Sequence, residues 1–305
     1  METRRLGNSG LVVTIAGLGC NNFGMRIDQA RAIDVVSAAL DVGVTFFDTA
    51  RSYGNGRSEE FLGVALKGRR DQVVVATKFG SARLESRGSR AELIRSVEAS
   101  LRALGTDWID LLQLHAPDPR TPIAETLDAL DSLVRKGKVR YIGCSNFSGW
   151  MIADAAWTAR TRHDTPFISV QNQWSLLSRE IEGEVTTAAE NFGFGVLPYF
   201  PLASGLLTGK IRPGQSAPAD SRLSVQGFDR VVTPENIDKV ERLRAWAEQR
   251  GWSVTRLALS WLASQPVVGS VIAGATSPQQ VRENAEATDS HMTPEEVSEA
   301  ASLVS

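Results

Sequence analysis

Apolar positions along the chain follow two periods that take turns. Short runs rich in β-branched residues, such as "VVVAT" at 73–77, are followed by longer runs in which apolar residues recur every three or four positions, as at 89–105. A short apolar run is typical of a buried strand, and the longer period is typical of an amphipathic helix. The pattern therefore predicts a succession of strand–helix units.

Eight such units follow one another from the N-terminus to the C-terminus. Polar residues and glycines bound the helices: one helix runs from about Asp28 to Gly43, Ser58 is a candidate N-cap with Gly68 as the stop, and Ser277 opens the last helix. The predicted strands are 12–19, 44–50, 72–80, 108–117, 139–148, 166–174 and 194–202, the predicted helices are 28–43, 58–68, 89–105, 121–138, 149–162 and 180–193, and 269–287 holds the eighth strand with its helix.

This order of elements indicates an α/β fold with a parallel sheet. Strands as apolar as 73–77 are buried on both faces, which is typical of sheets covered by helices. Eight units favour closure into a (β/α)8 TIM barrel. An open dinucleotide-binding sheet would carry G-x-G-x-x-G after its first strand, and "GLGCNNFG" at 17–24 lacks that spacing. We expect a single barrel domain over residues 1–305.

Several segments lie outside the eight units. Residues 2–13 predict an N-terminal hairpin with its turn at "GNSG". The Pro-, Gly- and Ser-rich segment 211–232 predicts a long loop, and loops of that length are usually lids, binding loops or disordered. Extra helices are expected at 234–250, 253–265 and 293–304.

Composition narrows the classes of partner. Of 305 residues, 42% are apolar and 22% are charged, and the net charge is -2 with no long basic run, so we expect neither a nucleic acid nor a membrane as partner. Two cysteines, Cys20 and Cys144, are too few for a disulfide framework and suit a reducing compartment. The N-terminus has no signal-type apolar run, so we expect a cytoplasmic protein. Three histidines without paired ligand spacing predict no metal site.

Polar side chains stand where the predicted strands end. Asp48 and Tyr53 follow the second strand, Lys78 follows the third and His115 follows the fourth. Taken singly, Lys78 reads as a solvated rim charge, His115 as a core histidine and Tyr53 as a surface aromatic residue. In a barrel, however, the carboxyl ends of all strands face one mouth, where catalytic residues gather. Their joint appearance at successive strand ends favours an active site.

These four residue types suit proton transfer to a carbonyl oxygen. A phenol has a pKa near ~10, and an ammonium nearby favours the phenolate. Lys78 can supply that charge, and Asp48 beside it would keep Lys78 charged and fixed. Tyr53 could then act as general acid while His115 orients a carbonyl oxygen. Reduction also needs a hydride, so we expect a nicotinamide cofactor.

The motifs together closely resemble the aldo-keto reductase superfamily. "GLGCNNFG", "FDTARSYGNGRSEEFLG", "VVVATKFG", "DLLQLHAPDP", "GKVRYIGCSNFS", "SVQNQWSLLSR", "PYFPLASGLLTGK" and "VIAGATSPQQVRENAEA" follow one another in the family's order over nearly the whole chain. The resemblance implies a (β/α)8 barrel that binds NADP(H) and interconverts carbonyls with alcohols. The family's catalytic tetrad falls on Asp48, Tyr53, Lys78 and His115, none of them substituted, with Tyr53 as the acid–base residue.

The same resemblance implies a set of cofactor positions. Those that hold the nicotinamide carboxamide match Ser145, Asn146 and Gln171, and Tyr199 matches the aromatic residue that stacks on the ring. The pyrophosphate loop matches Leu202, Ser204, Gly205 and Leu206, with Lys210 close by, and the adenosine and 2'-phosphate region matches Gly274, Ser277, Gln280, Glu283 and Asn284.

The chain departs from one branch of the family at the 2'-phosphate. Gly274 and Gln280 stand where many members have a lysine and an arginine, so a charge-based preference for NADP over NAD does not follow, and NAD(H) stays open. Arg282 or Arg222 could supply the missing charge, although each is also readable as a solvated side chain. Arg51 near the mouth could attract an acidic substrate or be a surface arginine.

The substrate pocket and the partners are less specified by the motifs. Motif position places Asn22, Phe23, Phe79, Phe147 and Trp174 near the mouth, as an aromatic lining for apolar aldehydes or ketones or as part of the barrel core. The leading interpretation is an enzyme, a monomer or weak homo-oligomer, whose partner is a small carbonyl compound. The alternative is a cofactor-binding regulatory subunit, because the superfamily includes channel-associated β subunits.

Overall fold

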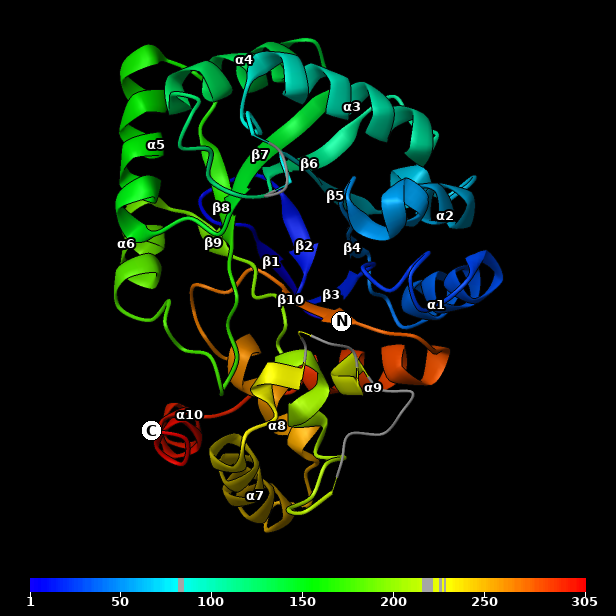
Figure 1. Cartoon of the computed structure of the whole chain (residues 1–305), viewed down its shortest axis with the longest axis vertical. Coiled ribbons are helices and arrows are strands. Elements are labelled where there is room, and N and C mark those ends of the chain that lie inside the picture. The colour runs from blue at the N-terminus through cyan, green and yellow to red at the C-terminus, as the bar shows by residue number, and fades with distance from the viewer. Residues whose placement is uncertain (82–84, 216–221, 225–226, 228) are drawn as a thin grey trace.

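Parallel strands curl around a common axis in the computed structural model, which describes residues 1–305 except 82–84, 216–221, 225–226 and 228. Figure 1 shows helices arranged around the outside of the strands. Across the described ranges the parallel strands are hydrogen-bonded in the order β10-β3-β4-β5-β6-β7-β8-β9. They are β3 (Ala16–Gly19), β4 (Phe46–Asp48), β5 (Val74–Phe79), β6 (Ile109–Leu114), β7 (Val139–Ser145), β8 (Phe167–Gln171), β9 (Gly195–Val196) and β10 (Val271–Gly274).

The two edge strands of this sheet, β9 and β10, are joined by individual hydrogen bonds. The Val196 amide donates to the Val267 carbonyl (2.8 Å), the Gly269 amide donates to the Val196 carbonyl (2.9 Å), and the Ile272 amide donates to the Pro198 carbonyl (3.1 Å). These bonds close the sheet on itself and leave no free edge. The predicted (β/α)8 barrel is confirmed.

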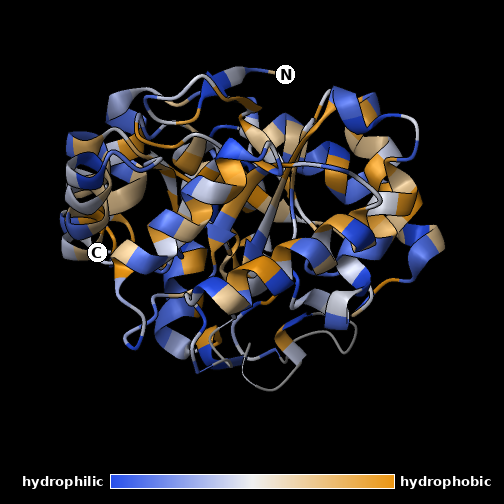
Figure 2. Ribbon diagram, turned by 90° about the horizontal axis from the view of Figure 1, so that it is seen from above, coloured by the Kyte–Doolittle hydropathy of each residue, from blue (hydrophilic) through white to orange (hydrophobic). Residues whose placement is uncertain are grey.

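Helices pack against the strands through faces of small and apolar side chains. In α3 (Arg90–Leu104), Leu93, Val97 and Leu101 recur every four residues and are buried, while charged residues lie on the other side. Figure 2 shows this division of apolar and polar residues along many of the ribbons. The other helices are α1 (Gln29–Asp41), α2 (Arg57–Ala65), α4 (Ile123–Arg135), α5 (Gly149–Arg162), α6 (Glu184–Phe192), α7 (Pro234–Glu248), α8 (Val254–Ala263), α9 (Pro278–Thr288) and α10 (Pro294–Ser302).

The N-terminal hairpin fills one end of the barrel. Strands β1 (Thr3–Arg5) and β2 (Val12–Thr14) pair antiparallel, as predicted for residues 2–13. One apolar cluster joins the hairpin to residues in the first halves of barrel strands and to Leu197 just after β9, and its buried members are Leu6, Leu11, Val13, Phe46, Ala76, Leu111, Leu197 and Ile272. The hairpin therefore closes the barrel at the end where these strands begin.

Three predicted boundaries need correction. The strand predicted at 12–19 is two elements, because β2 belongs to the hairpin and β3 begins the barrel. Ser58 is not an N-cap: α2 begins at Arg57 behind Gly56, and the Ser58 hydroxyl donates to the Cys20 carbonyl (2.8 Å). The seventh strand, predicted at 194–202, is reduced to β9, since the chain then bends around Pro198.

Within the described ranges α2 ends at Ala65, before the stop predicted at Gly68, while the N-cap signals of three other helices behave as expected. The side chains of Asp28, Ser89 and Ser277 accept hydrogen bonds from backbone amides of the first turns of α1, α3 and α9. The loop predicted at 211–232 contains short 3-10 turns at Arg222–Ser224 and Asp229–Val231, while residues 216–221, 225–226 and 228 lie outside the described part. No helix in the described ranges is both long and apolar enough to cross a membrane.

Candidate active site

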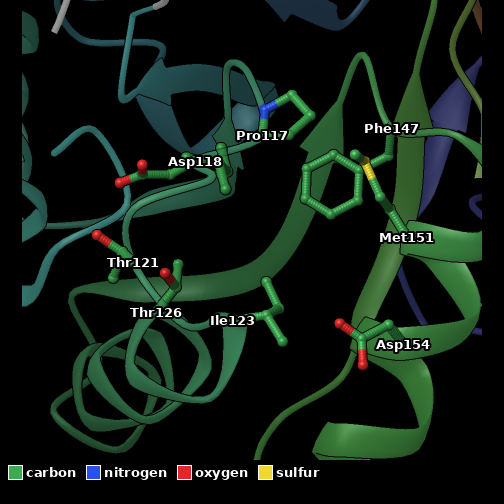
Figure 3. A pocket seen from close by; sticks show the side chains of 9 residues that line it. Pro117, Asp118, Thr121, Ile123, Thr126, Phe147, Met151 and Asp154 are labelled. Carbon is green, nitrogen blue, oxygen red and sulfur yellow. The ribbon is translucent and has the colours of Figure 1, made fainter. Parts of the chain in front are cut away.

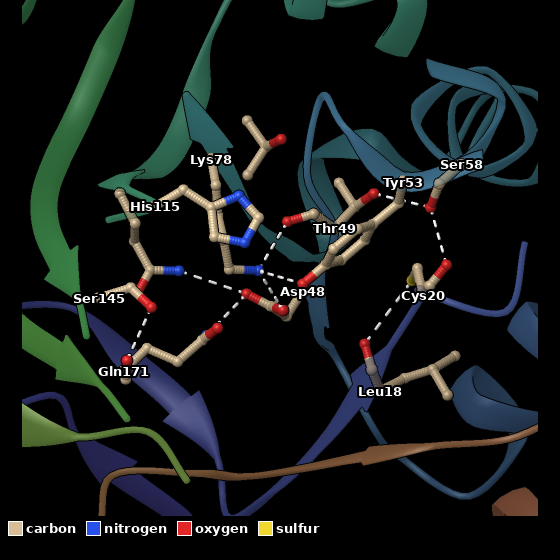
Figure 4. Close-up of polar contacts among 12 residues, drawn as sticks. Leu18, Cys20, Asp48, Thr49, Tyr53, Ser58, Lys78, His115, Ser145 and Gln171 are labelled. Atoms are coloured by element: carbon tan, nitrogen blue, oxygen red, sulfur yellow. Dashed lines mark hydrogen bonds and ion pairs between the residues drawn. The ribbon is translucent and has the colours of Figure 1, made fainter. Parts of the chain in front are cut away.

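The carboxyl ends of β4 and β5 place a carboxylate beside an ammonium inside the barrel. Asp48 is the last residue of β4, and Lys78 lies near the end of β5. Lys78 Nζ lies 2.5 Å from Asp48 Oδ2 and donates a second hydrogen bond to the Thr49 carbonyl (2.9 Å), as Figure 4 shows. Both side chains are almost completely buried. A buried charge pair with these additional hydrogen bonds keeps the ammonium in one position.

Tyr53 reaches this pair from a tight turn after β4. The turn Tyr53–Gly56 needs left-handed backbone at three successive residues, Gly54 (φ 57°), Asn55 (φ 56°) and Gly56 (φ 93°). Asparagine and glycine are the residues that tolerate this conformation. The Tyr53 hydroxyl lies 3.4 Å from the Lys78 ammonium, which in turn lies 5.0 Å from the centre of the phenol ring.

His115 completes the group from the end of β6. Its ring meets the ring of Tyr53 edge-on, with 5.8 Å between centroids. The structure thus brings together all four residues that the strand-end pattern predicted, from three neighbouring strands and one turn (Figure 4). Their roles in a reaction are proposed below.

Burial sets the protonation states at neutral pH. Burial raises the pKa of Tyr53, and Asp48 adds to this, so the opposing influence of Lys78 does not lower the phenol pKa as the sequence suggested. Burial alone would lower the pKa of Lys78, but Asp48 and Tyr53 together outweigh it and the pKa is raised. Burial, with the Lys78 charge, lowers the pKa of His115 to about 3. The site therefore holds a neutral phenol, an ammonium and a neutral imidazole.

A second buried amide, which sequence reasoning missed, also binds Asp48. Gln171 Nε2 donates to Asp48 Oδ1 (2.9 Å), and Gln113 Nε2 lies 3.3 Å from the same oxygen. Gln113 lies in β6, two residues before His115, and is fully buried. The available signal was a glutamine inside "DLLQL", a strand whose other late residues are leucines.

The carboxamide-binding candidates form a connected group at the mouth. The Ser145 hydroxyl donates to the Gln171 carbonyl (2.7 Å), and Asn146, with φ at 61°, donates through Nδ2 to the His115 carbonyl (2.9 Å). The Tyr199 hydroxyl donates to Asn146 Oδ1 (2.8 Å), and its ring is half-buried. Adjacent strands therefore bring these four candidates side by side, next to the catalytic candidates.

The predicted pyrophosphate loop makes a left-handed turn after β9. Ser204 (φ 58°) and Gly205 (φ 112°) lie inside the 3-10 segment Ala203–Thr208. No described atom lies within 4 Å of the point where a side chain of Gly205 would begin, so backbone there is open to a ligand. Leu202 is half-buried, Leu206 is buried in the core, and Lys210 is exposed just after the turn.

The candidates near α9 are partly used in capping the helix. Ser277 Oγ accepts from the Gln280 amide (3.3 Å), and Gln280 Oε1 accepts from the Thr276 amide (2.8 Å). Asn284 Nδ2 donates to the carbonyl of Gly274 (3.4 Å), which is exposed at the end of β10. The Gln280 oxygen is therefore occupied within the helix start. Glu283 and Arg282 are exposed on α9.

The two other arginines have partners in the chain. Arg222 Nη2 donates to Asn22 Oδ1 (2.6 Å) and to Asn21 Oδ1 (3.1 Å), which ties the long loop to the end of β3. Arg51 Nη1 lies 3.8 Å from Glu59 Oε2, a carboxylate with no exposure to solvent. Arg51 is thus more than a solvated side chain at the mouth.

The predicted substrate residues are mostly buried. Phe23, Phe79 and Trp174 are 0%, 2% and 2% exposed, and Trp174 packs edge-on against Trp261. Asn22 is buried as well, and Nδ2 donates to the Ala275 carbonyl (3.1 Å). The structure places these aromatic residues in the core and not at an open mouth, because they fill the gaps between strands and helices.

Phe147, the fifth candidate, lines a cavity behind the mouth. Figure 3 shows this cavity of about 180 Å³ between the loop after β6 and helix α5. Two of the acidic and hydroxyl groups around it already have partners: Asp118 Oδ2 accepts from the Gly88 amide (2.8 Å), and Thr126 Oγ1 donates to the Gly88 carbonyl (2.8 Å). The cavity's link to the candidate site is through the chain, since Phe147 follows Asn146 and Leu114 precedes His115. Its lining is Leu114, Pro117, Asp118, Thr121, Ile123, Thr126, Phe147, Met151 and Asp154.

A parallel barrel with ionisable and amide side chains gathered at one mouth is the architecture of a barrel enzyme. The profile of the "Aldo/keto reductase family" matches residues 16–305, and the chain belongs to that family. The resemblance seen in the motifs is confirmed. Members use nicotinamide cofactors, and this chain is an NAD(P)H-dependent oxidoreductase.

Curated relatives cover nearly the whole chain. A probable voltage-gated potassium channel subunit beta of Arabidopsis thaliana is 36% identical over 303 residues, which are 95% of this chain and 92% of that protein. The aldo-keto reductase YhdN of Bacillus subtilis is 36% identical over 300 residues, 94% of this chain and 89% of that protein. The uncharacterized oxidoreductase YrpG of the same bacterium is 35% identical over 304 residues, 95% and 91% respectively.

The groups at the mouth fit a nicotinamide cofactor. A planar carboxamide needs paired donors and acceptors, which Asn146 and Ser145 offer beside the Tyr199 ring. The open space beside Gly205 lets backbone approach phosphates closely. Across the described residues no cluster of histidine, cysteine or acidic side chains could hold a metal ion.

Proposed function

We propose that this protein reduces aldehydes or ketones to alcohols with NADPH, and that Tyr53 is the general acid. The observation that carries the proposal is the position of the Tyr53 hydroxyl, 3.4 Å from an ammonium that is itself fixed by a buried carboxylate. A phenol that stays protonated at neutral pH can donate a proton, and the ammonium stabilises the phenolate left behind.

Each residue then has one task. Tyr53 Oη gives its proton to the carbonyl oxygen, Lys78 supplies positive charge beside that oxygen, and Asp48 keeps Lys78 charged and in place. Neutral His115 orients the carbonyl oxygen by donating an N–H hydrogen bond. A nicotinamide cofactor held by the residues around the mouth would supply the hydride that the carbonyl carbon accepts.

Cofactor binding falls to the groups around the mouth. Ser145, Asn146 and Gln171 would hold the carboxamide, Tyr199 would stack on the ring, and the turn at Gly205 would lie against the pyrophosphate. Lys210 and the α9 side chains would face the adenosine half. Because Gly274 and Gln280 bring no positive charge to the 2'-phosphate position, we expect measurable use of NADH beside NADPH.

Replacing Tyr53 with phenylalanine tests this mechanism directly. The ring stays, but the proton donor is lost, so we expect kcat for aldehyde reduction to fall by at least about a hundredfold while NADPH binding is retained. The measurement is NADPH oxidation with a panel of aromatic and aliphatic aldehydes, beside a fluorescence titration with NADPH and NADH. Equal loss of binding and turnover would instead assign Tyr53 a structural role.

A second candidate function is that of a cofactor-binding regulatory subunit. The observation that favours it is an exposed apolar pair on α5, Trp150 and Trp157, which are 64% and 54% exposed and stand two helical turns apart. The relative in Arabidopsis thaliana is named as a probable channel subunit. NADPH binding without turnover on any carbonyl compound would favour this candidate over the reductase.

A further inference from the structure

The starting point is Gln113, a polar side chain in the interior of the barrel that the mechanism above does not use. Its neighbours across the sheet are Lys78 on β5 and Gly143 on β7. It has no exposure to solvent, whereas the residues beside it in β6, Leu112 and Leu114, are core leucines. A buried glutamine in such a strand costs stability unless both ends of its amide are hydrogen-bonded.

The orientation of the Gln113 amide is fixed by its neighbour. Asp48 carries a charge and only accepts hydrogen bonds, so Gln113 must turn Nε2 toward Asp48 Oδ1 (3.3 Å) and point Oε1 away. Gln171 Nε2 approaches the same oxygen at 2.9 Å, and Lys78 holds the other one at 2.5 Å. Three donors on three strands therefore hold the Asp48 carboxylate.

The far end of the Gln113 amide has no hydrogen-bond partner in the part of the chain that the structure describes. Gln113 Oε1 and Ser169 Oγ are both buried, and neither has a hydrogen-bond partner among the described residues. Both groups lie around Gly143: a side chain starting there would be 2.3 Å from Ser169 Oγ and 3.4 Å from Gln113 Cγ. The Ser169 hydroxyl packs into the place that a side chain of Gly143 would take, and Gln113 borders the same residue. Neighbouring buried polar atoms without a protein partner are the setting in which proteins hold internal water.

We propose that Gln113 is a positioning residue for the Asp48–Lys78 pair, and that a buried water molecule shared with Ser169 holds its amide. The expected change in kcat rests on the proposed carbonyl reduction, whereas the expected change in the pKa of Tyr53 does not. The amide presents the positive end of its dipole to Asp48, next to the ammonium that faces Tyr53. Without this donor the site is less positive, so the phenolate of Tyr53 is less stable.

Replacing Gln113 with methionine removes the amide and keeps most of the side-chain volume. We expect kcat for aldehyde reduction to fall about tenfold or more, because a hydrogen bond to a charged group is lost, while KM and NADPH affinity stay within twofold. Gln249→Met is the matched control, because Gln249 is exposed and directly follows α7. It should leave kcat, KM and NADPH affinity unchanged.

An absorbance titration of tyrosinate near 295 nm tests the proposal without any turnover. The chain has only three tyrosines, so Tyr53→Phe assigns the transition of Tyr53 against Tyr141 and Tyr199. In Gln113→Met the pKa of Tyr53 should move to higher pH. The groups that face Tyr53 stay the same in this variant and are Asp48, Lys78, Cys20, Tyr199, Arg222 and the ring of His115.

Ser169→Ala removes one hydroxyl and serves if Gln113→Met fails to fold. It should move the pKa of Tyr53 in the same direction by a smaller amount, since the water loses one partner. Unchanged kcat and an unchanged Tyr53 titration in the folded variants would overturn the proposal, as would a fall in thermal stability with normal turnover. If the Tyr53 shift appears although the wild-type protein reduces no carbonyl, the positioning role stands and the proposed function fails.

Discussion

At the scale of single residues, the site depends on charges that are buried unequally. Lys78 keeps its charge because Asp48 lies 2.5 Å away, whereas His115 loses its proton readily because burial and the Lys78 charge both disfavour the imidazolium. A cation beside an imidazole and burial act in the same direction on the imidazole pKa. The same ammonium therefore stabilises the phenolate that remains when Tyr53 gives up its proton, and it keeps the neighbouring histidine neutral.

This pKa of about 3 for His115 predicts a pH dependence of stability. The unfolded chain protonates this histidine near pH ~6.5, so between that pH and about 3 the unfolded state binds more protons, and stability falls as the pH falls. From pH 7 to pH 5 the loss from this group is about 2 kcal/mol. Urea unfolding at both pH values measures it.

His115→Gln is the comparison for this experiment, because glutamine keeps a polar side chain that does not titrate. The wild-type protein should lose about 2 kcal/mol more than His115→Gln between the two pH values. Equal losses in the two proteins would mean that His115 is protonated in the folded state. The exposed His163, at the end of α5, is present in both proteins, so its contribution cancels in the comparison.

Sequence reasoning at this scale succeeded where chemistry and strand position agreed. Asp48, Lys78 and His115 were predicted from their places after apolar strands, and the barrel geometry brought them together with Tyr53. Gln113 was missed because its role depends on the side chains of neighbouring strands. The sequence of one strand does not show how that strand is aligned with its neighbours. The aromatic substrate candidates stay a prediction for a related reason: a phenylalanine near a strand end looks the same in a core and in a pocket.

At the scale of elements, the turn Tyr53–Gly56 connects the active site to the outer helices. Arg51 packs beneath it, since a side chain at Gly56 would start only 2.0 Å from Arg51 Nη1, and Arg51 pairs with the buried Glu59 of α2. Thr77, next to Lys78, donates to Glu59 Oε1 (2.7 Å). The turn and β5 are thus held by one carboxylate.

Gly56→Ala should disturb both the turn and the site. Its left-handed backbone (φ 93°) disfavours alanine, and the new methyl group displaces Arg51, so we expect a loss of stability of more than about 1 kcal/mol and at least a tenfold lower kcat. Gly68→Ala is the matched control: φ is 79°, and no atom lies within 4 Å of the new methyl group.

Urea unfolding and NADPH oxidation measure the two effects separately. The control should show only the backbone cost of about 1 kcal/mol, with normal kcat. Normal kcat in Gly56→Ala as well would mean that the position of Arg51 does not matter to Tyr53. Element boundaries of this kind were the least predictable part of the chain. Ser58, for example, is of a residue type common at N-caps, but its hydroxyl donates to the Cys20 carbonyl.

At the scale of the whole molecule, the barrel separates stability from chemistry. The hairpin and the first residues of the strands form one apolar cluster, while the charged and amide groups lie toward the other ends of the same strands. Strand–helix order and apolar periodicity were enough to predict this architecture. The single-domain organisation stays a prediction, as do the oligomeric state and the small carbonyl partner.

Leu6→Ala should therefore destabilise the protein without changing its catalysis. Leu6 is fully buried between the hairpin and the strand ends, and removal of a buried leucine side chain costs about 2–5 kcal/mol. Val12→Ala in the same hairpin is the control, because Val12 is 49% exposed and should cost much less. Urea unfolding gives the stabilities, and kcat per folded molecule should be unchanged in both variants. A lower kcat in Leu6→Ala alone would show that the hairpin communicates with the mouth.

The closed end of the barrel also determines how small molecules reach the strand ends. The hairpin and a packed interior close one end of the barrel, so the barrel is open at the other end alone. Small molecules that reach the strand ends enter and leave through that opening. In the proposed reaction, substrate and cofactor would therefore share one opening. Changes in the loops around the mouth would alter access for substrate and cofactor at once, whereas changes in the hairpin at the closed end would alter access for neither.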